Sequence, residues 1–320
     1  MIKILHSKTL VVLLIGIMTT FTACNEYKSN TSTSNTTEAP VVSAEKIKTK
    51  PLAPKTKLSK DFKEYWYNGE AEITSFKLEQ ARYGEIREGE AVLVFVTEDF
   101  LPDIQVKADN YSKENTPVLK VNATKNFITG IYPYSIMQST FYPVADNQHA
   151  IKITTSVQEW CGQTYTQLNN RDNFEILTHS YFQNQADKSF EIEKALTENE
   201  LWAKLRINPK NLPVGQIDII PAMEFIRLNN VDFKPHKALA TLKDDSYTLS
   251  YDNLSRTLKI NFSPNFPFEI LGWEETTTSG RGDSVKTLTT KATKLETIKS
   301  DYWNKKSTSD SNLRDDLKLK

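Results

Sequence analysis

Cys161 is the residue whose type best suits nucleophilic chemistry in this sequence. It lies in the run QEWCGQ at 158–163. A thiol attacks as its thiolate, so a neighbouring base, His149 or His179, would have to remove its proton. The structural alternative is that Cys161 is a small apolar side chain buried in a strand, because a lone thiol in an oxidising compartment is safest when it is buried.

Glu159 is the second catalytic candidate because it interrupts an apolar run. Successive residues of a strand point to opposite faces, so Glu159 and Cys161 would share one face and Trp160 would take the other. A carboxylate and a thiol would then line one pocket. The alternative is that Glu159 is solvated or pairs with an arginine such as Arg82.

Metal and cofactor chemistry has little support in the sequence. His149, His179 and His236 are the histidines that follow the N-terminal segment, and none lies in an H-x-x-x-H or H-E-x-x-H arrangement. The chain contains no G-x-G-x-x-G or G-x-x-x-x-G-K phosphate loop and no G-x-S-x-G elbow. We therefore expect neither a metal nor a cofactor.

Tyr132, Tyr134 and Trp160 are the candidates for ligand binding. The two tyrosines lie in a stretch dense in aromatic residues, which also contains Phe141 and Tyr142. A tyrosine ring is apolar and its hydroxyl is polar, so several of them would suit an amphipathic cavity. The alternative is that these rings pack in the core, as strand aromatics usually do.

The N-terminus has the features of an export signal. Within 1–23, two lysines precede an apolar run at 9–18 that is too short to span a bilayer. The run FTAC at 21–24 resembles a bacterial lipobox, whose cysteine is acylated and becomes the mature N-terminus; the alternative is ordinary signal cleavage. Because two or three acyl chains anchor a protein stably, we expect Cys24 to hold the chain in the membrane. Asn25 favours the outer membrane, with the domain facing the periplasm.

Composition divides the rest of the chain into three parts. Residues 24–57 are rich in Ser, Thr, Asn, Lys and Pro and predict a flexible tether. Residues 58–298 predict a β-rich globular domain, as one body or two packed halves, and 299–320 predict a disordered tail. The 40 basic and 40 acidic residues of the chain balance, which argues against a nucleic-acid partner.

Strand patterns dominate the domain. A turn signal at 87–90 separates two expected strands of a hairpin, at 70–86 and 91–96. A capping box at 197–200 predicts one helix, and Pro221 predicts the start of a second. Together the elements predict a mainly β (α+β) fold, a curved antiparallel sheet or open half barrel with one or two short helices packed on it. The remaining expected strands are 117–122, 131–142, 149–160, 161–168, 173–184, 246–251, 257–262 and 266–274.

Several segments resemble a family of lipoproteins from flavobacteria and other Bacteroidota. The resemblance is carried by EYWY at 64–67 and by the runs at 75–102, 123–144 and 156–165. Such proteins often bear the label "septum formation inhibitor Maf", but the Ser-x-Ser-Pro-Arg-Arg signature of genuine Maf nucleotide pyrophosphatases does not occur in this chain. The resemblance therefore implies an envelope lipoprotein and little chemistry. Ser284 fits a short O-glycosylation pattern of Bacteroidota periplasmic proteins.

Three functional hypotheses follow from the sequence. The first is a non-enzymatic envelope lipoprotein whose domain binds a lipid, a glycan or an envelope protein. The second is an envelope hydrolase that uses Cys161 or Glu159. The third is a scaffold at the division site, as the family label suggests.

Overall fold

The computed structural model describes residues 53–279 and 285–319. These residues belong to one compact unit. Cys24, the signal at 1–23, most of the tether and Ser284 lie outside the described residues, and their roles stay predictions.

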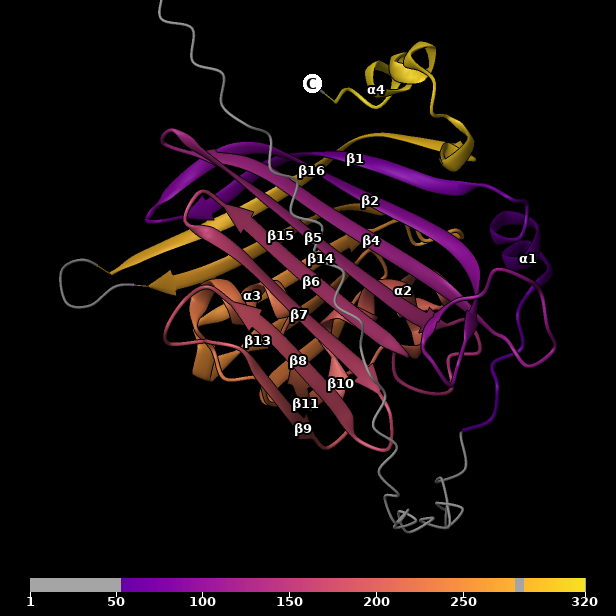
Figure 1. The fold of residues 1–320 in the computed structure, drawn as a ribbon, viewed down its shortest axis with the longest axis horizontal. Helices are drawn as coiled ribbons and strands as arrows, with labels where there is room; N and C mark the ends of the chain where they lie inside the picture. The colour runs from indigo at the N-terminus through magenta and orange to yellow at the C-terminus, as the bar shows by residue number, and fades with distance from the viewer. Residues whose placement is uncertain (1–52, 280–284, 320) are drawn as a thin grey trace, which may run out of the picture. The chain divides into compact units, whose positions relative to one another are not determined.

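One large curved sheet forms the domain (Figure 1). Its strands follow the order β10-β11-β12-β13-β14-β15-β16-β1-β2-β4-β5-β6-β7-β8-β9, and β3 pairs with β2 off this path. All neighbours are antiparallel except the short parallel pair β10–β11. The mainly β prediction is therefore confirmed. The strands are β1 (Ala71–Arg82), β2 (Glu85–Leu101), β3 (Val106–Lys107), β4 (Thr116–Thr129), β5 (Tyr132–Pro143), β6 (Lys152–Glu159), β7 (Gly162–Asn170), β8 (Phe174–Ser180), β9 (Lys188–Ile192), β10 (Leu196–Thr197), β11 (Gly215–Ile220), β12 (His236–Leu242), β13 (Ser246–Tyr251), β14 (Arg256–Phe262), β15 (Ile270–Ser279) and β16 (Lys286–Ser300).

Four short α-helices accompany the sheet in the described ranges: α1 (Lys60–Trp66), α2 (Glu198–Ile207), α3 (Met223–Asn229) and α4 (Asn312–Asp316). The predicted capping box is present, because the Thr197 hydroxyl accepts a hydrogen bond from the Glu200 N–H and the Glu200 carboxylate accepts one from the Thr197 N–H. The second predicted helix is α3, which starts two residues after Pro221 and ends at Asn230 in the left-handed conformation. Short 3-10 turns occur at Pro209–Asn211, Asp252–Leu254, Tyr302–Asn304 and Thr308–Ser311.

Helices α2 and α3 lie inside the curve of the sheet. Helix α2 contacts β4 and β5 on one side, and its Trp202 packs edge-on against Trp273 of β15 on the other, with ring centroids 5.4 Å apart. Helix α3 contacts β6. Leu201 and Leu205 of α2 are fully buried in the main core. The helices therefore fill the interior, and the space that they leave against the strands decides where a ligand can bind.

A buried ion pair ties α2 to β1. Arg206 donates two hydrogen bonds to the Glu72 carboxylate, at 2.5 and 2.6 Å, and both side chains are 1% exposed. The guanidinium carbon of Arg206 lies 4.7 Å from the ring centroid of Phe95. Tyr65 adds a third hydrogen bond to Glu72 at 2.5 Å. Since both charges are removed from water, neither is tolerated without the other.

The turn predicted at 87–90 was wrong. The β1–β2 hairpin turns at Tyr83 and Gly84, whose φ angles are 54° and 75°, as a two-residue hairpin loop of the primed type requires. Gly89 lies within β2 instead, where a Cβ atom would come 2.2 Å from the Asn126 carbonyl oxygen of β4. The glycine marks a close approach of two strands rather than a turn.

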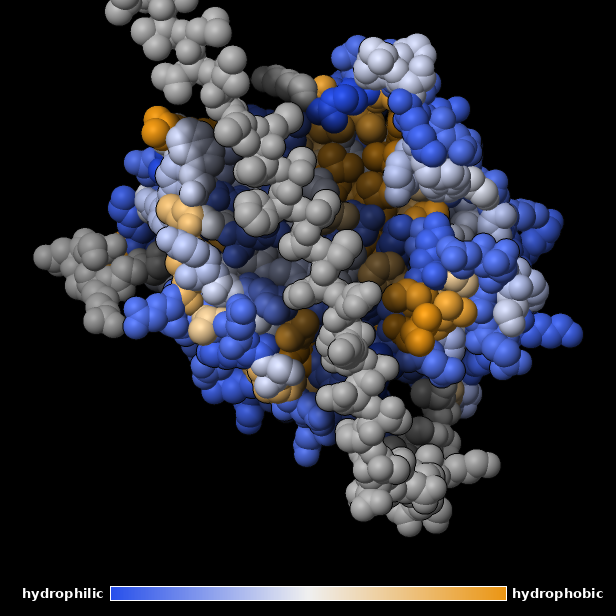
Figure 2. Space-filling model, viewed as in Figure 1, coloured by the Kyte–Doolittle hydropathy of each residue, from blue (hydrophilic) through white to orange (hydrophobic). Residues whose placement is uncertain are grey.

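The C-terminal segment, expected as a disordered tail, has short helical turns and α4 in the structure. Leu317 is 6% exposed and packs with Ala71, Ile73 and Val96. This cluster covers part of the outer face of β1 and β2. Figure 2 shows a hydrophobic area beside this segment and a second one lower on the same face.

No helix in the described ranges is long and apolar enough to cross a membrane.

Candidate functional site

Two cavities lie on opposite faces of α3. Glu224, Phe225 and Leu228 line one of them, with a volume of about 90 Å³. Met223, Ile226 and Arg227 line the other, with a volume of about 460 Å³. Residues three and four positions apart share one face of a helix, so the short sequence of α3 serves both cavities. We call the first the charged cavity and the second the amphipathic cavity.

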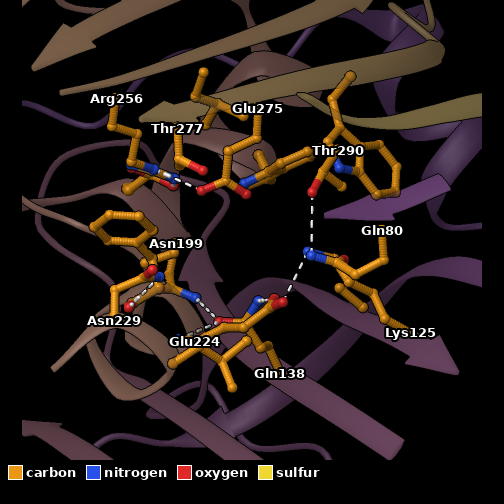
Figure 3. A pocket seen from close by; sticks show the side chains of 18 of the residues that line it. Gln80, Lys125, Gln138, Asn199, Glu224, Asn229, Arg256, Glu275, Thr277 and Thr290 are labelled. Atoms are coloured by element: carbon orange, nitrogen blue, oxygen red, sulfur yellow. Dashed lines mark hydrogen bonds and ion pairs between the residues drawn. The ribbon is translucent and has the colours of Figure 1, made fainter. Parts of the chain in front are cut away.

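The charged cavity lies between the two inner helices and strands β1, β4, β5 and β14–β16 (Figure 3). On one side, Lys125 Nζ lies 2.9 Å from Glu224 Oε1 and Gln138 donates to Glu224 Oε2 at 3.1 Å. Asn199 of α2 donates to Gln138 Oε1 at 2.9 Å. Two strands, β4 and β5, and two helices, α2 and α3, are thus joined by one chain of polar contacts.

Arg256 forms the opposite side of the charged cavity. Its Nη1 and Nη2 donate to the two oxygens of Glu198, at 2.5 and 2.7 Å, and its Nε donates to Glu275 at 2.6 Å. Burial lowers the pKa of Arg256, but the two carboxylates outweigh it and the net shift is upward. Burial raises the pKa of Glu275, yet Arg256 and Lys125 hold it below its ordinary value.

These shifts fix the charges of the network. The pKa of Lys125 is raised as well, because Glu224 and Glu275 outweigh the effect of burial. A general acid or base needs a pKa near the working pH, and the shifts of Lys125, Arg256 and Glu275 all move away from neutrality. The network joins helices α2 and α3 to the sheet through paired charges and hydrogen bonds.

Two buried polar atoms of residues that line the charged cavity, Gln80 Oε1 and Arg82 Nε, have no hydrogen-bond partner in the described residues. Gln80 donates through Nε2 to Thr290 Oγ1 at 3.1 Å, but its Oε1 is buried and accepts no hydrogen bond from the described residues. A water molecule needs roughly 10–15 Å³ of such volume, so about 90 Å³ is room for several. The cavity suits water or a very small polar molecule.

The amphipathic cavity has a hydroxyl-rich wall on the inner faces of β7, β8 and β9. Cross-strand pairing places Thr164 opposite Ser180, Thr166 opposite Thr178, and Thr178 opposite Lys188. Residues directly opposite each other in a sheet present their side chains to the same face. The wall therefore carries several hydroxyl groups and one ammonium group.

The opposing wall of the amphipathic cavity has an apolar part and a polar part. Met223, Ile226, Val231 and Phe233 form the apolar part, and Arg227, Asn230 and Asp232 form the polar part. Phe233 packs edge-on against Phe190 of β9, with ring centroids 5.9 Å apart. A molecule in this cavity would contact hydroxyls on one side and both hydrocarbon and polar groups on the other.

The structure brings the three predicted ligand-binding aromatics together, at the ends of the hairpins. Ring centroids are 6.4 Å apart for Tyr132 and Trp160 and 6.0 Å apart for Tyr132 and Tyr134. Tyr134 is buried and stacks on Phe127, with ring centroids 5.0 Å apart, whereas Trp160 is 68% exposed. None of the three lines either cavity.

Cys161 is exposed, so the expectation of a buried thiol was wrong. It lies in the tight turn between β6 and β7, where the alternation of strand faces does not apply. Its N–H donates to Glu159 Oε2 at 2.8 Å. The contact with Glu159 raises the pKa of the thiol, which disfavours the thiolate. Glu159 makes this turn contact rather than the suggested pair with Arg82, whose guanidinium donates to Leu228 O, Tyr83 and Tyr134.

The histidines have structural partners. His149 Nδ1 lies 2.9 Å from Glu200 Oε1 of α2, and His179 Nδ1 lies 3.5 Å from Asp187. His236 Nδ1 lies 3.1 Å from Asn253 Nδ2. In the part of the chain that the structure describes, no group of three or more His, Cys, Asp or Glu side chains could hold a metal ion.

Sequence reasoning missed the amphipathic cavity. The sequence pattern that could have indicated it is the pair Thr164 and Thr166. These residues occupy the same inward-facing side of β7 as the buried Leu168. Hydroxyls at positions where a core strand would carry Val or Ile indicate an inner face that is not fully packed. The pattern becomes meaningful only once α3 is known to lie opposite.

Comparison with solved structures gives matches of low sequence identity, among them the following two. A β-barrel-like protein of domain of unknown function DUF1849 from Brucella abortus matches with 10% identity and a TM-score of 0.40, covering 72% of this chain and 97% of that one. A porin-like protein from Bacteroides uniformis ATCC 8492 matches with 10% identity and a TM-score of 0.22, covering 70% of this chain and 95% of that one. No family model and no curated protein matches the chain. The function therefore has to be inferred from the chain's own residues.

Proposed function

We propose that this chain is a non-enzymatic envelope protein whose β-rich domain binds a lipid in the amphipathic cavity. The observation that carries the proposal is the cavity itself, with about 460 Å³ between a hydroxyl-rich wall and a partly apolar wall. Small-molecule sites commonly have volumes of roughly 300–1,000 Å³ and combine apolar lining with a few polar groups. The envelope location, with an acyl anchor on Cys24 at the periplasmic side of the outer membrane, rests on the sequence of residues 1–25.

The hydrolase hypothesis has less support than binding. A nucleophilic thiol needs an adjacent base, and among the described residues Cys161 is in contact with Glu159, which raises its pKa. His149 is engaged by Glu200. No observation favours the division-site scaffold.

Native mass spectrometry of the full chain, extracted in mild detergent from its own membrane, tests the proposal. We expect an adduct of lipid-like mass on the wild type. Thr166→Trp, which fills the cavity, should lose the adduct, while Thr154→Trp on the outer face of β6 should keep it. A wild type of bare mass, or an adduct retained in Thr166→Trp, would contradict the proposal.

A further inference from the structure

We propose that the amphipathic cavity binds the acidic group of its ligand, a carboxylate or a phosphate, through Arg227. This inference rests on the proposed function, since it names the chemical class of the molecule in the same cavity. The ligand would be an amphiphile with an acidic head group.

Arg227 is held in place while its terminal nitrogens remain available. Its Nε donates to Thr164 Oγ1 at 3.1 Å, and its guanidinium carbon lies 4.4 Å from the ring centroid of Phe182. Among the described residues, its Nη1 and Nη2 have neither a hydrogen-bond acceptor nor a carboxylate at ion-pair distance. A guanidinium fixed through Nε presents these two nitrogens as a fork, which matches the geometry of a carboxylate or phosphate.

Arg206 and Arg256 are buried and each is paired with a carboxylate, whereas Arg227 is only partly buried. Arg206 donates both terminal nitrogens to Glu72, and Arg256 donates both to Glu198. Arg227 borders a cavity and has no such carboxylate. The contrast leaves the two terminal nitrogens of Arg227 available to bind a molecule other than this chain.

A second arginine lies close to Arg227. Arg82 lines the charged cavity on the other face of α3, and its Nη1 donates to the carbonyl of Leu228, the residue after Arg227. Burial and the charge of Arg82 together lower the pKa of Arg227. The lowered pKa reflects the repulsion between two guanidinium groups that are partly removed from water. Glu159, together with Tyr134 and Tyr83, acts in the opposite direction. An anion beside Arg227 would remove this repulsion.

The remaining charges of the cavity leave it positive. Lys188 reaches the cavity from β9 and has no ion pair in the described ranges. The acidic lining residue Asp232 is exposed and pairs with Lys234 at 2.9 Å. The hydroxyls of Thr166 and Thr178 are available as additional donors to an anion. The apolar part of the opposite wall would take the hydrocarbon part of the ligand.

Isothermal titration calorimetry on the full chain, with ligands that share one tail, tests the inference. The probes are decanoate, decyl phosphate and the uncharged decanol, together with inorganic phosphate. Because hydrogen bonds to charged groups are strong, we expect the two acidic amphiphiles to bind the wild type about 10- to 100-fold more tightly than decanol. Arg227→Gln should remove this preference, and Arg227→Lys should keep part of it. Arg171→Gln, at an exposed turn outside the cavity, should behave as the wild type.

The outcomes separate the two proposals. Equal binding of decanoate and decanol to the wild type would overturn the anion site and leave lipid binding standing. Failure of all three amphiphiles to bind would overturn the proposed function. Inorganic phosphate that binds as tightly as decyl phosphate, with the same dependence on Arg227, would support the anion site and overturn the lipid. Where Arg227→Gln does not fold, Lys188→Gln replaces a residue at an exposed position and should weaken the binding of the two acidic amphiphiles but not that of decanol. Unchanged binding of the acidic amphiphiles to Lys188→Gln would count against the anion site.

Discussion

Removing one partner of the buried Glu72–Arg206 pair should destabilise the domain strongly. Glu72→Gln leaves the guanidinium of Arg206, which is 1% exposed, without its counter-charge. A buried ion that loses its partner costs about 3–5 kcal/mol. Arg206→Met removes the other charge and should cost a similar amount for the same reason. Tyr65 and the Pro267 carbonyl, which also bond to the pair, keep both losses at the upper part of that range.

The double variant separates pairing from burial. With both charges replaced, no uncompensated ion remains. The double variant should therefore lose less unfolding free energy than the sum of the losses in the two single variants, by up to about 3 kcal/mol. Denaturant unfolding followed by tryptophan fluorescence measures all four proteins, since Trp66 lies 5.0 Å from the Arg206 guanidinium. Strictly additive losses would refute the reasoning.

The pH dependence of stability supplies a second check on the same pair. Burial would raise the pKa of Glu72, but Arg206 outweighs it and holds the pKa below the ordinary value of 4.5. The contribution of the pair is therefore complete above pH 4.5 and is lost as the pH falls through the folded-state pKa. The stability gap between wild type and Glu72→Gln should narrow below pH 4.5. A gap that is constant down to pH 3 would contradict the assigned charges.

Two further predictions concern a thiol and a glycine. In a Cys24→Ser background, Cys161 should react with a maleimide in the native protein. Glu159→Gln should speed this reaction at pH 8, because the contact with Glu159 raises the pKa of the thiol. An unchanged reaction rate would contradict that cause of the pKa shift. Gly89→Ala should lose about 1–3 kcal/mol of unfolding free energy in denaturant titrations, because its Cβ would meet the β4 backbone at 2.2 Å. At Gly130 an added Cβ would have no neighbour within 4 Å, but the φ angle is +60°, so Gly130→Ala should lose only about 1 kcal/mol of unfolding free energy. Equal losses in Gly89→Ala and Gly130→Ala would count against the steric argument.

Local signals in the sequence predicted much of the sheet and both inner helices. The β4–β5, β6–β7 and β7–β8 hairpins have alternating inward residues and short turns, and the capping box at Thr197 marks α2 correctly. The strand β16 (286–300) was missed because its sequence is a run of Thr and Lys with few apolar residues. It lies between β1 and β15. The hydroxyls of Thr276 in β15 and Thr289 in β16 form a hydrogen bond that a sequence pattern does not predict.

The site was the harder part to predict. Arg227 and Thr164 are 63 residues apart in the chain, and Glu72 and Arg206 are 134 apart. Pairs at such separations are fixed by the curvature of the sheet and the placement of α3, which periodicity does not encode. Cys161 was a catalytic candidate because of its residue type. Its position in a turn leaves it exposed, and the neighbouring Glu159 carboxylate raises the pKa of its thiol.

The strand order makes this domain a circular permutation of a simple meander. The first and last long strands, β1 and β16, pair in the middle of the sheet, with Ala71 opposite Ser300, while the consecutive strands β9 and β10 lie at its two edges. Joining Ser300 to Ala71 and opening the chain at 193–195 would give a sequence whose long strands pair in chain order. Such a permutant would replace the most distant strand pairing by a local one and lower the relative contact order, and topologies of lower contact order fold faster. In the natural order, the sheet is completed only when the two ends of the domain meet.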